Sequence, residues 1–190
     1  GRVAAANDLF ASAFAALQLG NVTDVAAIFS DGDTAGPAPA GGAEHRAHEA
    51  GDEAIVTVIE RELKALIRMA KQDPAGAVAL MKQAAGTEIQ MSFEFGPPLP
   101  VKPANELFGE MLLQLGRPAE ARQQFELALA RAPRRALSLL GLAQAAARSG
   151  DSAAASKACR DLLQVWRRAD PGIPGLGEAR RILGPTSPTR

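Results

Sequence analysis

The chain of 190 residues contains no tyrosine, a single tryptophan, a single cysteine and only two histidines. One cysteine excludes an internal disulfide bond. No apolar run comes near the roughly 20 residues that a membrane-spanning helix requires, so we expect no membrane insertion. The scarcity of aromatic side chains also leaves little surface for stacking on nucleic-acid bases.

A net charge of either sign is missing too, because 21 basic and 21 acidic residues cancel. The cancellation hides an asymmetry: residues 1–100 hold 13 acidic and 7 basic side chains, whereas residues 101–190 hold 8 and 14. Such a split could draw the two halves together or present opposite faces to different partners. The basic residues are spread along several predicted helices, so we expect ordinary solvated helix faces and no nucleic-acid partner.

Alanine, in contrast, makes up about a fifth of the chain, leucine is common and β-branched residues are sparse. High helix propensity over the whole length predicts an all-α protein. The preference for alanine, and for arginine over lysine, suggests a bacterial origin, and we expect a soluble protein of the bacterial cytoplasm or periplasm. Because the chain begins with Gly1 and Arg2 instead of methionine, we expect it to be a processed piece of a longer protein.

Residues 103–168 repeat themselves with a period of 34. The coinciding positions hold apolar or small residues: Phe108 and Leu142, Gly109 and Ala143, Leu112 and Ala146, Gly116 and Gly150, Ala121 and Ala155, Phe125 and Cys159, Ala128 and Leu162. Such a period is typical of helix-turn-helix repeats that stack into a solenoid. On these positions about a third of the chain resembles the tetratricopeptide repeat (TPR) family. The resemblance implies antiparallel helical hairpins stacked as a right-handed solenoid.

The turns of both repeats carry residues that end one helix and start the next. Gly116 and Gly150 follow the first helix of each repeat, where the backbone often becomes left-handed. Pro118 suits the first turn of a helix, and Asp151 can accept hydrogen bonds from the free amides that follow it. The sequence therefore predicts two hairpins with well-defined ends.

The rest of the chain completes a single predicted helical-repeat domain over residues 1–183, with two non-helical insertions. The first insertion is rich in Gly, Pro and Asp, and the second alternates apolar and polar residues before a run of prolines. Between them, one helix is predicted to begin after Asp52 and the next at the start signal Asp73-Pro74. The layout is a degenerate repeat at 2–29, a flexible loop at 30–51, a helical hairpin at 52–86, an extended strap at 87–102, repeats at 103–135 and 136–168, a capping helix at 174–183 and a disordered tail at 184–190.

The strap at 87–102 admits two interpretations. Its apolar side, formed by Ile89, Met91, Phe93 and Phe95, seals the core between two hairpins, or it forms a lip of a binding groove or a docking segment for a partner. Residues 97–100 also match the short PxxP pattern.

In the TPR family the first helices of successive repeats line a concave groove, and the repeat register carries this property to eight positions here. They are Glu106, Glu110, Leu113 and Gln114 from one repeat, and Leu137, Leu140, Gln144 and Arg148 from the next. This mixed surface of apolar, carboxylate and amide groups would suit an extended peptide or a helix of a partner protein. It lacks the Lys/Asn/Arg arrangement by which some family members hold a C-terminal carboxylate, so that ligand is not expected.

The one metal-like cluster is His45-x-x-His48, flanked by Glu44 and Glu49. On a helix, histidines three positions apart could share one face and hold a transition ion. No third ligand is evident and the segment is rich in glycine, so we interpret both histidines as solvated loop residues and expect no metal or cofactor. Cys159 occupies an apolar position of its repeat, and we expect it to be buried and unreactive.

Catalytic signatures are missing as well. No glycine-rich phosphate loop follows a strand, and Glu60 and Glu62 project from different faces of one predicted helix, so they are poor acid–base partners. The leading interpretation is a non-enzymatic scaffold or adaptor that binds a peptide or partner subunit, within a larger bacterial assembly. Two alternatives are an accessory or regulatory domain of a larger enzyme, and a metal-dependent enzyme that uses His45 and His48.

Overall fold

The structure is a computed structural model that describes residues 8, 10–12, 43–91 and 102–184, with only the backbone described for residues 43–52. These residues are all-helical and include no strand, as predicted. The chain divides into two compact units, unit 1 at residues 1–104 and unit 2 at residues 105–190, where the sequence predicts one domain. Within the described ranges, no helix combines the length and apolar character that crossing a bilayer requires.

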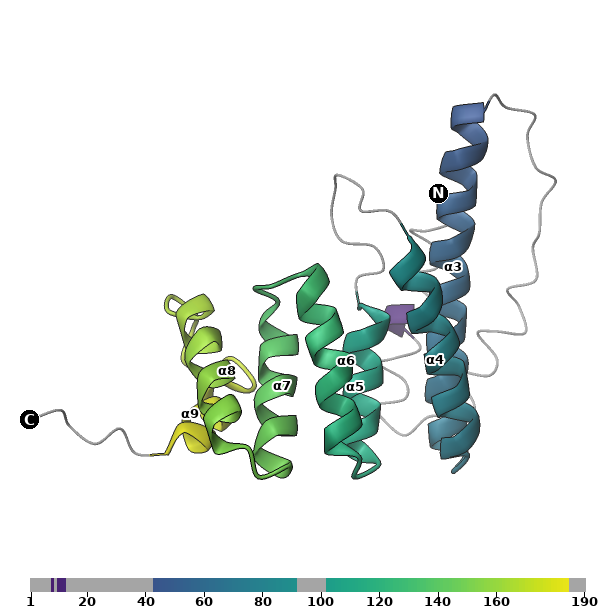
Figure 1. The fold of residues 1–190 in the computed structure, drawn as a ribbon. Coiled ribbons are helices and arrows are strands. Elements are labelled where there is room, and N and C mark those ends of the chain that lie inside the picture. The colour runs from purple at the N-terminus through teal and green to yellow at the C-terminus, as the bar shows by residue number, and fades with distance from the viewer. Residues whose placement is uncertain (1–7, 9, 13–42, 92–101, 185–190) are drawn as a thin grey trace, which may run out of the picture. The chain divides into compact units, whose positions relative to one another are not determined.

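Unit 1 contains a helical hairpin made of α3 (Ala43–Ala70) and α4 (Pro74–Gln90), as Figure 1 shows. Asp73 ends the turn, and its carboxylate accepts a hydrogen bond from the Gly76 backbone N–H at 2.9 Å. Pro74 holds the first helical position, where its missing N–H is not needed. The predicted start signal is thus confirmed. The buried faces of the two helices carry apolar residues at helical spacing: Ile55, Val58, Ile59 and Leu63 from α3, and Ala77, Val78, Met81, Ala84 and Ala85 from α4.

Helix α3 begins at Ala43, well before the predicted start. Asp52 therefore lies inside the helix and is not its N-cap, and the prediction of a flexible loop is wrong for residues 43–51. Alanine, glutamate and arginine favour a helix, and the single Gly51 costs it only about 1 kcal/mol. Residues 30–42 of the predicted loop lie outside the described residues.

Helix α4 continues to Gln90, so the first residues of the predicted strap are helical and not extended. Ile89 lies on this helix and is 43% exposed, which corrects its assignment to the buried side of a strap. Alternation of apolar and polar residues over so short a stretch does not outweigh the propagation of an established helix. Phe93, Phe95 and the prolines at 97–100 lie outside the described residues.

The other two end segments are described only in part. Of the degenerate repeat predicted at 2–29, residues 8 and 10–12 are helical and Phe10 is buried, and the remainder lies outside the described residues. The predicted tail at 184–190 lies outside them as well, except for Gly184.

A carboxyl group is fully buried within unit 1. The side chain of Glu62 is 0% exposed, and neither of its oxygens has a hydrogen-bond partner among the described residues. Burial raises the pKa of Glu62 well above its usual range, the nearby Glu88 carboxylate raises it further, and Lys102 partly opposes them. Glu88 is itself buried and accepts a hydrogen bond from the Ala104 backbone N–H at 2.8 Å. Folded unit 1 therefore favours the protonated form of Glu62.

Glu62 should make unit 1 less stable as pH rises. Because its pKa is higher in the folded state, the stabilising contribution of its proton is complete below the unfolded pKa of about 4.3 and is lost as pH rises through the folded pKa. Glu62→Gln keeps the shape and removes the titration. We therefore compare the thermal midpoint of Glu62→Gln with that of wild type at pH 4 and at pH 8. The difference, variant minus wild type, should be several degrees larger at pH 8, since 1 kcal/mol shifts the midpoint of a small domain by about 4–8 °C.

Glu60→Gln is the matched control for this measurement, because Glu60 is exposed on the same helix and pairs with Lys64. It removes a carboxyl group from an exposed site and should not reproduce the pH-dependent gain. A midpoint difference between Glu62→Gln and wild type that stays constant from pH 4 to pH 8 would show that Glu62 does not titrate abnormally.

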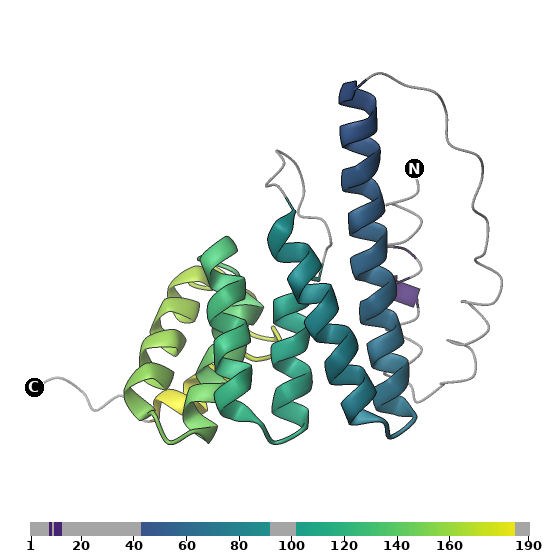
Figure 2. The same ribbon diagram turned by 45° about the vertical axis from the view of Figure 1, so that its right-hand side comes forward.

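Unit 2 is built from successive helices that pack on their neighbours (Figures 1 and 2). Helix α6 packs on α7, α7 on α8, and α9 on both α8 and α7. The helices fall where the two repeats and the capping helix are predicted. Their bounds are α5 (Ala104–Gln114), α6 (Pro118–Arg131), α7 (Ala136–Arg148), α8 (Ser152–Val165) and α9 (Leu176–Leu183).

The two turns of unit 2 have the same hydrogen bonds, 34 residues apart. The Arg117 N–H donates to the Leu112 carbonyl at 2.9 Å, and the Asp151 N–H donates to the Ala146 carbonyl at the same distance. Gly116 and Gly150, which precede these donors, have φ values of 70° and 79°, a left-handed conformation that favours glycine. The predicted helix ends are confirmed, and the sequence period of 34 reappears in the backbone.

One aromatic ring fills the space between three helices of unit 2. Phe125 of α6 is 0% exposed. A Cβ atom added to Gly109 of α5 would lie 2.7 Å from the ring, and one added to Gly141 of α7 would lie 2.3 Å from it. Both distances are shorter than real contacts, so the ring packs directly on the backbones of both helices.

A second cluster repeats this arrangement with smaller residues. Ala143 and Cys159 are both buried in it, in the register of Gly109 and Phe125. Burial raises the pKa of the Cys159 thiol, and Glu178 adds to the rise against the opposing effect of Arg160. The thiol is therefore buried as predicted and is held in its protonated, less nucleophilic form.

Asp151 links the two hairpins of unit 2. Its carboxylate accepts the Ala154 backbone N–H at 2.9 Å, which confirms the predicted N-cap of α8. The other oxygen pairs with Arg122 of α6 at 2.8 Å, and Arg122 also binds Glu126 at 2.9 Å. The hydrogen bond from Ala154 and the Arg122 guanidinium both lower the pKa of Asp151, so the link is charged at neutral pH.

Candidate binding groove

A groove with a volume of about 440 Å³ lies between α5 and α7 of unit 2. Seven of the eight predicted groove residues line this α5–α7 groove, namely all except Glu106, and Gly141 is the additional lining residue. The sequence period therefore brought residues from two separate repeats to one cavity. The volume lies within the range of about 300–1,000 Å³ that is usual for ligand pockets.

The spacing along the two helices explains why these side chains gather. Leu137, Gly141, Gln144 and Arg148 follow one another at intervals of three or four, so they share one face of α7. On α5, Leu113 and Gln114 lie three and four positions after Glu110, so both are its neighbours on the helix surface. The groove is thus formed by two helix faces, and its lining is fixed by secondary structure instead of by loops.

Leucine side chains form one end of the groove. Leu137 is 44% exposed, which makes it one of the most exposed large apolar residues in the described part of the chain. Leu140 is half-buried beside it and packs on the α9 end at Gly175. The third lining leucine, Leu113 of α5, is almost fully buried and lies at the other end, where its carbonyl accepts a hydrogen bond from Arg148. At the apolar end, an exposed leucine beside a half-buried one offers apolar area that a ligand could bury.

The opposite end is polar. The Arg148 Nη1 donates to the Leu113 backbone carbonyl at 3.0 Å, which ties α7 to α5 at this end. Gln114 lies in the last turn of α5, at the same end, and the Glu110 and Gln144 side chains line the middle of the groove. A guanidinium has five N–H donors and each amide has two donors and one acceptor, so this end can bind carboxylate and peptide groups.

The structure places Glu106 away from the groove. Its side chain is 0% exposed and forms a two-pronged ion pair with Arg135, with distances of 2.7 Å from Nε and 3.0 Å from Nη2. The Ser138 hydroxyl also donates to it. Arg135 precedes α7, so this buried pair joins α5 to the start of α7 and positions the two walls of the groove. The repeat pattern does not predict this pair. The position 34 residues after Glu106 is Leu140, so no second carboxylate occurs there to indicate a recurring ion pair of the repeat.

Gly141 is the lining residue that sequence reasoning missed. The signal was present, because Gly141 lies four positions after Leu137 and three before Gln144 on the same helix face. Its lack of a side chain is required by Phe125, which packs directly beneath it. The floor of the groove is therefore backbone supported by an aromatic ring.

The metal-like cluster gains no further support. His45 and His48 fall in the helical backbone of α3, and not in a loop as predicted, but their side chains lie outside the described set. Among the described side chains, no three His, Cys, Asp or Glu residues come together in a way that could hold a metal ion.

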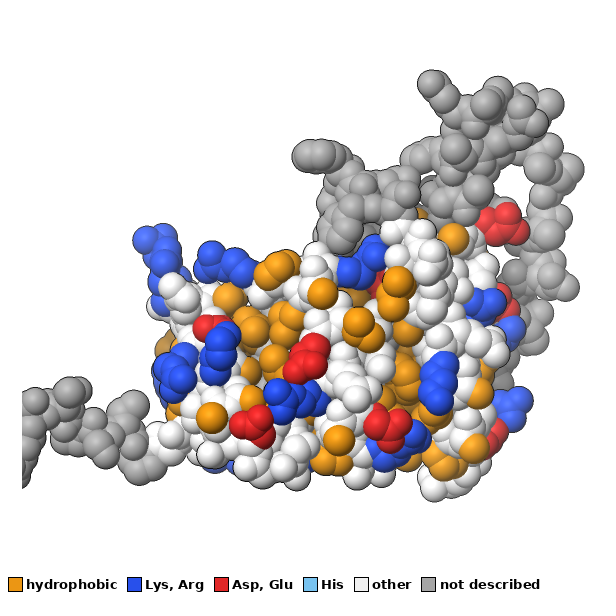
Figure 3. Space-filling view, viewed as in Figure 1, with side chains coloured by type: hydrophobic (Ala, Val, Ile, Leu, Met, Phe, Trp, Pro, Cys, Tyr) orange, Lys and Arg blue, Asp and Glu red, His pale blue; other side chains and the backbone are white. Residues whose placement is uncertain are grey.

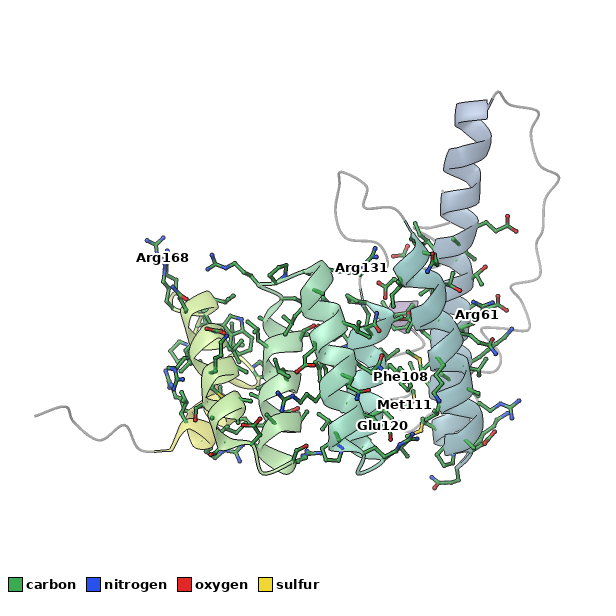
Figure 4. The ribbon with its side chains drawn as sticks, in the orientation of Figure 1. Arg61, Phe108, Met111, Glu120, Arg131 and Arg168 are labelled. Carbon is green, nitrogen blue, oxygen red and sulfur yellow. The ribbon has the colours of Figure 1, made fainter. Side chains whose placement is uncertain are left out.

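Charged and apolar side chains are interspersed on the face of the protein that Figure 3 shows, where basic, acidic and hydrophobic groups lie among one another. Outside the groove, the exposed arginines of unit 2 include Arg160 on α8 and Arg168, which projects from the end of α8 in Figure 4.

Comparison of the chain with protein-family models, with curated proteins and with solved structures finds no match.

Proposed function

We propose that this protein is a non-enzymatic adaptor that binds a peptide segment of a partner protein in the α5–α7 groove, within a larger bacterial assembly. The observation that carries the proposal is the gathering of apolar, amide and charged side chains from two repeats around one cavity of about 440 Å³. Peptide binding requires this combination, because side chains need apolar contact and the peptide backbone needs donors and acceptors.

The helical architecture supports the same proposal. The 34-residue recurrence of turns and helix contacts, together with the resemblance to the TPR family, favours a TPR-like right-handed solenoid. In such a solenoid, parallel first helices leave a concave surface that is accessible to an extended or helical segment. Rigid helices hold the lining in place before binding, which lowers the entropy cost of association.

Leu137→Glu tests the proposal. A library of random 16-residue peptides displayed on phage is selected on the full chain, and the selected peptides are synthesised for affinity measurement. Leu137→Glu should weaken their binding at least tenfold, because it places a charge at the apolar end of the groove. Circular dichroism should remain unchanged, since the side chain is 44% exposed.

The matched control is Leu127→Glu on α6, where the leucine is 43% exposed but does not line the groove. This variant should bind within about twofold of wild type. Equal loss in both variants, or no loss in either, would rule out the groove as the binding site.

A further inference from the structure

We infer that the α5–α7 groove selects an extended segment that carries an aliphatic side chain and, four residues away, a carboxylate side chain. This inference rests on the proposed peptide-binding function and specifies its ligand. The starting observation is the separation of chemistry along the groove, with Leu137 and Leu140 at one end and Arg148 at the other.

Arg148 is the group that recognises the carboxylate. Its side chain is exposed, and one of its N–H groups holds the Leu113 carbonyl at 3.0 Å. This bond orients the guanidinium at the end of the groove and leaves several donors for a ligand. A carboxylate can accept two parallel N–H bonds from a guanidinium, which makes this pairing both strong and directional.

The charge of unit 2 favours the same ligand. Residues 105–190 contain 13 basic and 8 acidic side chains, and the internal ion pairs of Arg135, Arg122 and Lys157 leave this basic excess unchanged, because each pair uses one group of either sign. A basic surface attracts acidic segments over distances of about a Debye length. Glu110 in the middle of the groove opposes a continuous acidic run, so the ligand carries its carboxylate at the Arg148 end.

The distance between the apolar end and Arg148 sets the spacing. Leu140, the nearer leucine of the apolar end, is eight residues from Arg148 on α7, which corresponds to about 12 Å along the helix. Side chains on one face of an extended peptide are about 6.6 Å apart, so two such steps, or four residues, span the distance. In a helical ligand the same distance would require seven or eight residues.

The amides that line the groove favour the extended form. The side-chain amides of Gln114 and Gln144 can pair with the free N–H and C=O groups of an extended backbone, whereas the backbone groups of a helix are already paired with one another.

The experiment is the same random 16-residue library, read by sequencing after selection on wild type and on Arg148→Glu. On wild type we expect enrichment of Leu, Ile or Val four positions from Asp or Glu. On Arg148→Glu the acidic preference should be replaced by Lys or Arg at the same spacing. In synthetic peptides, changing the selected Asp to Asn should weaken binding to wild type about tenfold, and it should not weaken binding to Arg148→Glu.

Arg160→Glu is the control for the change in net charge, because Arg160 is exposed on α8 and does not line the groove. It should keep the wild-type preference. If the apolar and acidic residues of the selected peptides are seven or eight positions apart, the inference that the ligand is extended is wrong. Peptides that lose affinity on Leu137→Glu but show no acidic preference would overturn the role of Arg148 while leaving the proposed function intact. Failure to select any peptide would contradict both the inferred ligand preference and the proposed peptide-binding function.

Discussion

Replacing Glu106 with alanine should destabilise unit 2 by about 3–5 kcal/mol. The carboxylate is 0% exposed and its partner Arg135 is only 22% exposed, so the variant leaves a largely buried guanidinium without its counter-charge. Since 1 kcal/mol shifts a domain of this size by about 4–8 °C, the thermal midpoint should fall by at least about 12 °C. Differential scanning calorimetry of the full chain measures this fall.

Two further variants show whether the buried pair is the cause. Glu106→Leu combined with Arg135→Met removes both charges, and we expect the double variant to be more stable than either single variant. Asp161→Asn breaks the exposed Lys157–Asp161 pair of α8 and should leave the midpoint unchanged. A double variant as unstable as the sum of its parts would mean that shape, and not charge, governs this site.

Gly141→Ala should destabilise unit 2 by about 1–3 kcal/mol, although alanine is the better helix former by about 1 kcal/mol. The new methyl group would lie 2.3 Å from two carbons of the Phe125 ring. The ring cannot retreat, because Gly109 approaches it from α5, where a Cβ would lie only 2.7 Å away. Urea denaturation followed by circular dichroism gives the free energy of unfolding.

Gly177→Ala is the matched control, because Gly177 also lies in a helix of unit 2 but has nothing within 4 Å of an added Cβ. It should not lose stability. Combining Gly141→Ala with Phe125→Leu should cost less than the two single changes together, since the smaller side chain leaves room for the methyl group. Additive costs would indicate that the ring and the glycine do not compete for one space.

The hairpins of unit 2 could be predicted from the sequence because each of their determinants is local. Gly116, Gly150 and Asp151 act within a turn or two of their own position, so the residue types alone specify the helix ends. The α3–α4 turn shows the limit of such rules. Gln72 adopts a φ of 60° there, which no residue-type rule predicts for glutamine.

The groove could be predicted only in part, because its lining combines local register with long-range contacts. Helical spacing on α7 would also have predicted Gly141 as a lining residue of the groove. Glu106 was misassigned because repeat register cannot reveal that an arginine 29 positions away buries the carboxylate. For the same reason, the burial of Glu62 followed from α3 packing and not from any sequence motif, since glutamate is rarely buried alone.

The contact of Phe125 with two glycine backbones means that a residue outside the groove sets the groove's width. The ring acts as a spacer between α5 and α7, because no side chain of Gly109 or Gly141 shares the gap. In the following hairpin the corresponding positions hold Cys159 and Ala143, two small residues in place of a large ring and a glycine. Two proteins with identical groove linings could therefore differ in the ligands they admit, if their spacers differ in thickness.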